Sequence, residues 1–375
     1  MMSPGGKPTI TIKSNARSSE MDSRIWSNLP VELLEHILCF LPFKILFNLR
    51  STCKLFNTLV YSPNFISKCS ASSSPFSSFL LFSHPQCHNR FALYDSVVGT
   101  WHNISLPLSV LLPCSAPSAH LSSSNGLLCL SNPNSSSMLV CNLLTKSTRA
   151  IEFPTYPFEF ELLTLVSTPE GYKIFMLCSG SSSNCAFVYS SKFLSWQRFD
   201  GFQATLGDNF HQEGVPFNGC LYFTTPEPCS IVCFDLESGK WDRPNVELPN
   251  QLTFVRLVSE KRGKLYMIGG IGSNGISRNI KLWEVDESGN RVELESLPEM
   301  MCRKFGSVCY HNYEHVYCFW HQGMICICCY TWPEILYYKV TRKTWHWLPK
   351  CPSLPEKWNF GFRWFSFVPE ICAFV

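Results

Sequence analysis

Six segments of this chain share an eight-residue pattern, and this repeat limits the possible folds more than any other feature. Two copies, YDSVVGTW at 94–101 and FDLESGKW at 234–241, run aromatic residue, Asp, three residues, Gly, any residue, Trp. The other four are degenerate and lie at 141–148, 189–196, 285–292 and 338–345. Because polar residues and glycine favour tight turns, each copy predicts a β-hairpin whose return strand begins at its last residue.

The spacing of the copies predicts the architecture. Their last residues are separated by roughly 45–53 residues, and apolar strand-like runs such as NGLLCL (125–130) and GKLYMIGG (263–270) precede the hairpins. About four strands in such a period are typical of a β-propeller blade, because radial stacking buries both faces of each small sheet. We therefore predict an all-β propeller over residues 79–375, with six blades. Seven blades would require a hidden degenerate unit, and the alternative, a β-sandwich, has no reason to repeat at this period.

The two ends of this body predict how the ring closes. The first unit, at 79–107, is one strand short, whereas the C-terminal segment FRWFSFVPEICAFV (362–375) has no hairpin after it. We expect the C-terminal segment to complete the first blade.

A short helical module precedes the body. Leu34, Ile37, Leu38 and Leu41 are spaced to line one face of a helix that begins near Pro30. Pro42 ends this helix, and two further helices are expected over 44–49 and 53–61. Three helices in so short a segment cannot bury all of its leucines against one another. The excess apolar surface is a candidate docking face, although it could instead pack on the rest of the chain.

Composition sets the class of protein. The chain is 45% hydrophobic and 16% charged, so most of it is expected to be folded. Its formal net charge is +3 and its basic residues are scattered, which argues against nucleic-acid binding. No apolar stretch approaches the roughly 18–20 residues that span a bilayer, and no secretory segment opens the chain. We expect an intracellular protein of the nucleus or cytoplasm, with reduced, buried cysteines, a disordered leader at 1–21 and a Ser-rich linker at 67–78.

Few residues predict chemistry. The cysteines of the CICC run at 326–329 alternate along an apolar strand, so buried packing is favoured over zinc binding. The GxGxxG match at 270–275 is followed by a strand-like run rather than a helix, which favours a loop between strands over a nucleotide site. No catalytic constellation is present, so we expect no enzymatic activity and no cofactor. The polar insertion at 200–216 carries three candidate partner contacts, Phe202, Phe210 and His211, although an ordinary mobile loop is the favoured interpretation.

The helical module closely resembles an F-box, which is the module that docks substrate receptors on the Skp-type adaptor of cullin–RING ubiquitin ligases. Phe56 stands where that family most often has Trp, so it keeps an aromatic ring but lacks the indole N–H. The resemblance assigns residues 22–66 to an F-box and implies that its adaptor contacts are Leu29, Pro30, Leu33, Leu34, Ile37, Leu38, Leu41, Pro42, Leu46, Leu49, Arg50, Cys53 and Phe56.

The body resembles kelch-type and plant F-box-associated repeats. Gly269 and Gly270 after an apolar run, followed by Trp283, give the best kelch-like fragment, and the other units lack the double glycine. The two resemblances together identify the chain as similar to plant F-box/kelch-repeat proteins. They imply a non-catalytic substrate receptor of a Skp–cullin–F-box ligase, whose partners are the adaptor, the cullin and RING subunits behind it, and a target protein. The alternative is a propeller scaffold or transcriptional co-regulator outside ubiquitination.

Overall fold

A computed structural model gives the structure of the chain. It describes residues 24, 28–41, 43–50, 52–71, 78–84, 90–105, 120–131, 135–145, 147–154, 160–179, 184–200, 211–226, 228–260, 263–352, 354, 360–371 and 373–375. The predicted leader at 1–21 lies outside these residues. The chain divides into two compact units, Met1–Ser74 and Pro75–Val375, which are described separately below.

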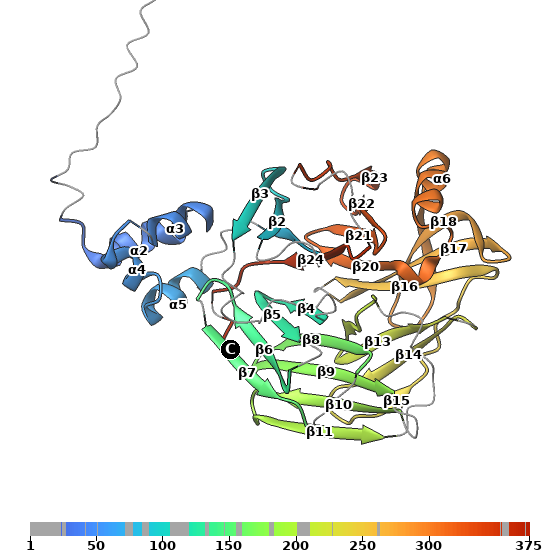
Figure 1. Cartoon of the computed structure of the whole chain (residues 1–375), viewed down its shortest axis with the longest axis horizontal. Helices are drawn as coiled ribbons and strands as arrows, with labels where there is room; N and C mark the ends of the chain where they lie inside the picture. The colour runs from blue at the N-terminus through green and yellow to red at the C-terminus, as the bar shows by residue number, and fades with distance from the viewer. Residues whose placement is uncertain are drawn as a thin grey trace, which may run out of the picture. The chain divides into compact units, whose positions relative to one another are not determined.

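The first unit contains four described helices, so the prediction of three was wrong. They are α2 (Val31–Cys39), α3 (Phe43–Arg50), α4 (Lys54–Leu59) and α5 (Pro63–Ala71) (Figure 1). The third helix ends before Pro63, as expected from the range 53–61. Pro63 then begins a fourth helix, because proline at a first helical position forfeits no hydrogen bond. Helix α5 also corrects the predicted linker at 67–78, whose first five residues, 67–71, are helical.

A buried carboxylate joins α2 to α5. Glu35 lies inside the unit, where its Oε2 contacts Lys68 Nζ at 2.6 Å and its Oε1 accepts a hydrogen bond from Ser62 Oγ at 3.3 Å. A buried charge is tolerated when it is paired and hydrogen-bonded in this way. The ion pair between Glu35 and Lys68 holds α5 against α2.

The second unit is all-β apart from short helical insertions. In its described residues the strands form six antiparallel four-stranded sheets. The first sheet orders β24 (Arg363–Phe367), β1 (Phe79–Ser83), β2 (Arg90–Asp95) and β3 (Thr100–Ser105). The second contains β4 (His120–Ser124), β5 (Leu127–Ser131), β6 (Ser137–Asn142) and β7 (Ser147–Glu152). The third contains β8 (Leu162–Thr168), β9 (Gly171–Ser179), β10 (Asn184–Ser190) and β11 (Ser195–Asp200).

The other three sheets follow in chain order. The fourth contains β12 (Val215–Phe217), β13 (Cys220–Thr225), β14 (Ser230–Asp235) and β15 (Trp241–Asp242). The fifth contains β16 (Leu252–Glu260), β17 (Lys264–Ser273), β18 (Ile276–Val285) and β19 (Arg291–Ser296). The sixth contains β20 (Val316–His321), β21 (Met324–Cys329), β22 (Trp332–Lys339) and β23 (Thr344–Trp347).

One strand of each sheet contacts the corresponding strand of its neighbours. Contacts link β24 to β4, β4 to β8, β12 to β16, β16 to β20, and β20 back to β24. The third and fourth sheets meet where the backbone N–H of Gly214 donates to Thr164 Oγ1 at 2.9 Å. Figure 1 shows the sheets of this unit arranged around these strands. This radial stacking of small sheets is the architecture of a β-propeller, as predicted.

The C-terminal segment completes the first sheet, which confirms the predicted mode of closure. Strand β24 pairs antiparallel with β1, from Phe79 opposite Phe367 to Ser83 opposite Arg363. Beyond β24 the chain continues to the second sheet, where Asn142 Nδ2 donates to the carbonyl oxygens of Glu370 and Ala373 at 3.0 and 2.8 Å. The end of the chain therefore holds the first two sheets together.

The repeated eight-residue pattern forms the predicted hairpins. Asp95 and Asp235 each accept hydrogen bonds at Oδ1 from the backbone N–H groups two and three residues later. Gly99 and Gly239 follow with φ of 75° and 68°, a conformation that glycine adopts without strain. The aspartate and the glycine thus make the turn in these two copies. The copy at 285–292 also turns on an aspartate and a glycine, Asp286 and Gly289, although its glycine comes one position earlier.

The outer residues of the pattern face each other across the hairpin. Tyr94 lies opposite Trp101, with ring centroids 5.0 Å apart. Four more copies show the same register, in the pairs Cys141–Thr148, Tyr189–Trp196, Phe234–Trp241 and Tyr338–Trp345. The copy at 285–292 is offset by one residue, because Val285 pairs with Arg291 rather than with Val292.

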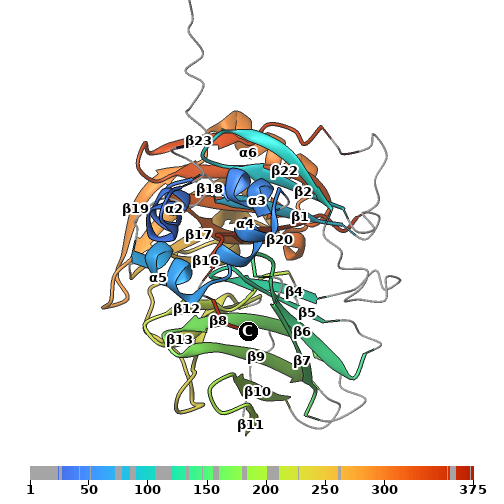
Figure 2. The same ribbon diagram turned by 90° about the vertical axis from the view of Figure 1, so that its left-hand side faces the viewer.

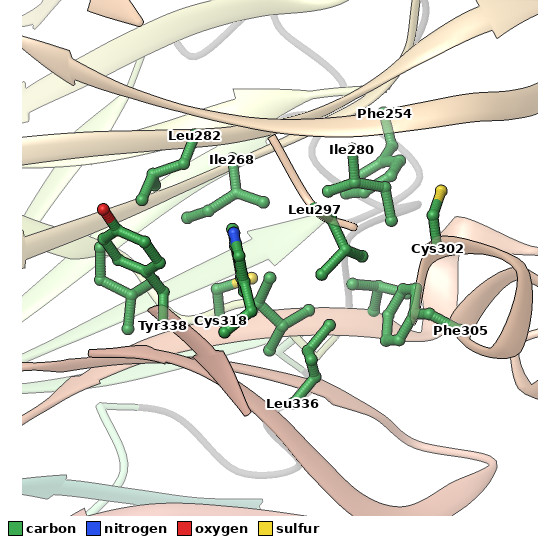
Figure 3. Close-up of a cluster of buried hydrophobic side chains, with 14 of the residues drawn as sticks. Phe254, Ile268, Ile280, Leu282, Leu297, Cys302, Phe305, Cys318, Leu336 and Tyr338 are labelled. Carbon is green, nitrogen blue, oxygen red and sulfur yellow. The ribbon is translucent and has the colours of Figure 1, made fainter. Parts of the chain in front are cut away.

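The sheets bury their apolar faces against one another. Figures 1 and 2 show the second sheet beside the third, and the two share a cluster that includes Cys129, Val140, Ile174 and Met176. Between the fifth and sixth sheets, Ile268, Leu282 and Leu336 pack with Phe305 of α6 (Glu299–Val308) (Figure 3). Helix α6 was not predicted. The GxGxxG match covers the end of β17 and the turn to β18, so a strand follows it, as expected, and not a helix.

A buried histidine predicts acid sensitivity of the propeller. His321 is fully buried, with Nδ1 2.9 Å from Ser366 Oγ and Nε2 3.0 Å from Ser96 Oγ. Burial lowers the pKa of His321 from 6.5 to about 3. As the pH falls below about 6.5, the unfolded chain binds a proton that the folded chain refuses, so stability should fall by up to about 1.4 kcal/mol per pH unit.

Urea unfolding of wild type and His321→Gln at pH 7.5 and pH 5 tests this expectation. The glutamine side chain can still bond both hydroxyl groups, but it does not titrate. We expect the wild type to lose more stability between the two pH values than the variant loses. Equal losses would show that His321 is not the group responsible.

Candidate binding surfaces

The first candidate surface is the set of exposed apolar side chains on the helical unit. Leu33 is 54% exposed, Ile37 is 37% exposed and Phe40 is 57% exposed. Leu33 and Ile37 are four residues apart on α2, and Phe40, the C-cap residue of this helix, follows three residues later, so the three side chains lie on one face. Val31, Ile45 and Leu55 are also exposed. Several exposed large apolar side chains in so small a unit are typical of a protein interaction site.

The structure divides the predicted adaptor contacts into exposed and buried residues. Pro30, Leu33, Ile37 and Cys53 are exposed, whereas Leu29, Leu34, Leu41, Leu49 and Phe56 are half-buried. Leu38 and Leu46 are each only 2% exposed, so they belong to the core and cannot contact a partner in this conformation. Pro42 and the side chain of Arg50 lie outside the described residues. Cys53 caps α4, because its Sγ accepts a hydrogen bond from the Phe56 N–H at 3.5 Å.

Sequence reasoning missed Val31, Phe40, Ile45 and Leu55. The helical spacing of Phe40 from Leu33 and Ile37 was available as a signal, but the pattern was anchored on Leu34 and Leu41 instead. That choice selected the face of α2 that is more buried.

The second candidate surface lies in the propeller, where three consecutive residues before β12 reach three other sheets. Gln212 Oε1 accepts the backbone N–H of Cys318 at 2.9 Å, and Gln212 Nε2 donates to the Cys318 carbonyl at 3.2 Å. Glu213 accepts a hydrogen bond from Ser122 Oγ at 2.5 Å. The Arg363 guanidinium donates to the His211 carbonyl at 3.1 Å. This segment therefore contacts β20, β4 and β24 between the sheets of the ring.

The side chain of His211 is the centre of a cluster. Its ring stacks on Tyr330, with centroids 4.0 Å apart and planes 11° from parallel. Its Nε2 lies 3.4 Å from His315 Nδ1, and its Nδ1 lies 3.3 Å from Arg363 Nη1. His211, His315, Tyr330 and Arg363 are all partly exposed. We call these four residues the His211 cluster. The other two predicted contacts of this loop, Phe202 and Phe210, lie outside the described residues.

Glu213 is the acidic group next to this cluster. Burial raises the pKa of its carboxyl from 4.5 to about 7, while the Ser122 hydrogen bond and the charge of Arg363 act in the opposite direction. The carboxyl is therefore only partly ionised near neutral pH and balances only part of the charge on Arg363.

The described residues provide no metal site and no membrane segment. No group of three or more His, Cys, Asp or Glu side chains among them could hold a metal ion. Cys326 and Cys328 are fully buried on β21, and burial raises the pKa of both thiols. Within the same residues, no helix has the length and apolar character needed to cross a membrane.

Comparison with known proteins supports both units. Residues 26–68 match the F-box domain model, and residues 101–283 match the model of the F-box associated beta propeller domain. Over all of this chain and 93% of the relative, the sequence is 53% identical to F-box/kelch-repeat protein At5g43190 of Arabidopsis thaliana. F-box only protein 6 of the same plant is 25% identical over 89% of this chain and 72% of the relative. Protein UNUSUAL FLORAL ORGANS, also from Arabidopsis thaliana, is 22% identical over 88% of this chain and 80% of the relative. The chain therefore belongs to the F-box/kelch-repeat family, in which an F-box is followed by an F-box-associated β-propeller.

Proposed function

We propose that this protein is the substrate-recognition subunit of a Skp–cullin–F-box ubiquitin ligase. The observation that carries the proposal is the F-box match at 26–68 on helices that expose Leu33, Ile37 and Phe40. An adaptor that covers these side chains would remove apolar surface from water, which is the main source of affinity in such interfaces.

The propeller is the second binding element in this proposal. Each of its six sheets serves as one blade, and the ring holds a target protein. The receptor then acts by proximity, because it raises the effective concentration of target lysines near the charged ubiquitin-conjugating enzyme. The chain itself forms and breaks no bonds.

Co-purification with a Skp-type adaptor tests the docking surface. We expect the double variant Leu33→Asp/Ile37→Asp to weaken adaptor binding at least about a hundredfold, because two apolar contacts become carboxylates that the interface must desolvate. Both side chains are exposed in the free protein, so the helical unit should still fold.

The matched control is Val97→Asp/Val98→Asp. These two valines are also exposed, but they lie in a hairpin turn of the propeller. The control variant should retain the adaptor, and both variants should keep the thermal transition of the propeller. Undiminished adaptor binding by Leu33→Asp/Ile37→Asp would contradict the proposed interface. If the propeller kept its biological function after deletion of residues 26–68, the scaffold or co-regulator alternative would be favoured.

A further inference from the structure

We infer that the His211 cluster is a binding site for an oxyanion, either a carboxylate or a phosphate, which the partner of the propeller carries. The cluster consists of His211, His315, Tyr330 and Arg363. The partner being a ubiquitination target rests on the proposed function, but the site itself does not. The inference rests on which hydrogen-bond donors and acceptors of these side chains already have a partner and which do not.

The four residues come from separate parts of the propeller. His211 precedes β12, His315 ends the short 3₁₀ helix η3 (Tyr313–His315), Tyr330 lies between β21 and β22, and Arg363 begins β24. Their convergence depends on the whole ring, so it is a property of the folded propeller and not of one loop. Groups placed on such a framework can be held in a fixed geometry.

Arg363 is fixed in place and still has donors to offer. Its Nη1 contacts both the carbonyl and the Nδ1 of His211, and its guanidinium lies 5.4 Å from the Tyr317 ring centroid and 5.6 Å from that of Phe365. Among the described residues, no hydrogen bond occupies its Nε or Nη2 and no carboxylate forms an ion pair with it. A guanidinium presents its donors in a fork that matches two oxygens of one carboxylate or phosphate.

The same geometry assigns the protons of the two imidazoles. Arginine can only donate, so His211 Nδ1 accepts from Arg363 and His211 carries its proton on Nε2. That proton points to His315 Nδ1, which must accept it, and His315 therefore carries its own proton on Nε2. Within the described part of the chain, His315 Nε2 has no hydrogen-bond partner. The hydrogen-bonding positions left open on His315 and Arg363 are therefore all donors.

An acceptor-only group satisfies such a site. Carboxylate and phosphate oxygens accept without donating, whereas a cation or an amide N–H would meet only other donors. Among the described residues, two carboxyl groups bear on this site. Glu213 acts on Arg363 but is only partly ionised near neutral pH, and Glu314, next to His315, is exposed and acts on Arg256. Neither forms an ion pair with the cluster.

Exposed aromatic residues flank the cluster along the chain. Phe360 lies three residues before Arg363, and Tyr310 lies five residues before His315. Tyr310 and His311 adopt φ of 52° and 54° where α6 ends, and their backbone N–H groups donate to the carbonyls of Ser307 and Gly306, so this backbone terminates the helix. Aromatic side chains beside charged donors are a common composition for the anchors of a protein interface.

Fluorescence anisotropy with three labelled peptides tests the site on the full-length chain. The peptides are hexaglutamate, a glycine–alanine peptide with one phosphoserine, and hexaglutamine as the neutral reference. We expect at least one anionic peptide to bind more tightly than hexaglutamine, and the tighter of the two identifies carboxylate or phosphate as the preferred group. Arg363→Gln and His315→Gln should each weaken that binding about tenfold, the effect of losing one charge-assisted hydrogen bond.

The matched control is Arg342→Gln. Arg342 is exposed in the turn after β22, at the opposite end of the sixth sheet from Tyr330, and its replacement removes the same charge. The inference would be overturned if Arg342→Gln and Arg363→Gln lost the same peptide affinity. It would also be overturned if the wild type preferred neither anionic peptide to hexaglutamine. Thermal unfolding of each variant, together with Arg363→Lys, which retains the charge, separates lost binding from lost folding. The docking variant Leu33→Asp/Ile37→Asp should bind the peptide normally, so failure of one proposal leaves the other testable.

Discussion

A chain that ends at Phe362 is expected to lose the cooperative unfolding transition of its propeller. The deletion removes β24, which pairs with β1 and contacts β4 and β20. It also removes Trp364, Phe365 and Phe367, all of them buried. Loss of a buried large aromatic side chain costs about 3–5 kcal/mol, so three such losses match or exceed the roughly 5–15 kcal/mol that stabilise a typical domain. Differential scanning calorimetry and tryptophan fluorescence measure the transition.

Two point variants give a graded form of the same experiment. Trp364→Ala should lower the stability of the propeller by about 3–5 kcal/mol, while Phe374→Ala should change it little because Phe374 is largely exposed. Retention of a sharp transition near the wild-type temperature by the truncated chain would show that the ring does not need β24.

Arg256→Met is expected to give the largest loss of stability from a single polar side chain. Arg256 is buried, and its three nitrogens donate to the carbonyls of Val316, Val255 and Tyr313 at 2.6, 2.7 and 2.6 Å. Methionine fills most of the space but donates nothing, so the carbonyls lose these donors in a place that water does not reach. We expect a loss of about 3–5 kcal/mol, measured by urea unfolding.

Arg303→Met on α6 is the matched control for this substitution. Arg303 is paired with Glu299 one helical turn earlier, and both side chains are mostly exposed. Exposed pairs of this kind contribute about 0–1 kcal/mol. If the two variants unfolded at the same urea concentration, the three hydrogen bonds of Arg256 would not be important for the fifth and sixth sheets.

The sequence predicted the features that depend on local patterns. Hairpins such as 94–101 were recognisable because Asp95 and Gly99 make the turn, and the incomplete first unit pointed to the C-terminal strand. The same reasoning ended the third helix before Pro63 but missed the fourth helix, since a proline that cannot continue one helix can begin the next. Helix α6 was missed because a strand-rich repeat gave no reason to expect a helix between two sheets.

The candidate sites were harder to predict than the fold. Nothing local to His211 indicates that it meets His315, Tyr330 and Arg363, because these contacts exist only once the ring has closed. The burial of Leu38 likewise depends on the arrangement of the four helices. A sequence pattern gives the apolar residues of a helix, but packing decides which of them remain exposed.

The pairing of β1 with β24 also constrains the order of folding during synthesis. The helical unit leaves the ribosome before the propeller and depends on local contacts, so it can fold while the propeller is still being made. The first sheet must wait, because β24 is translated after all the other described strands of the propeller. Until then β1 has an unpaired apolar edge, which is a hazard for aggregation. Translation should therefore produce an intermediate with a folded F-box and an open ring, and a chaperone that recognises extended apolar segments would act on that edge.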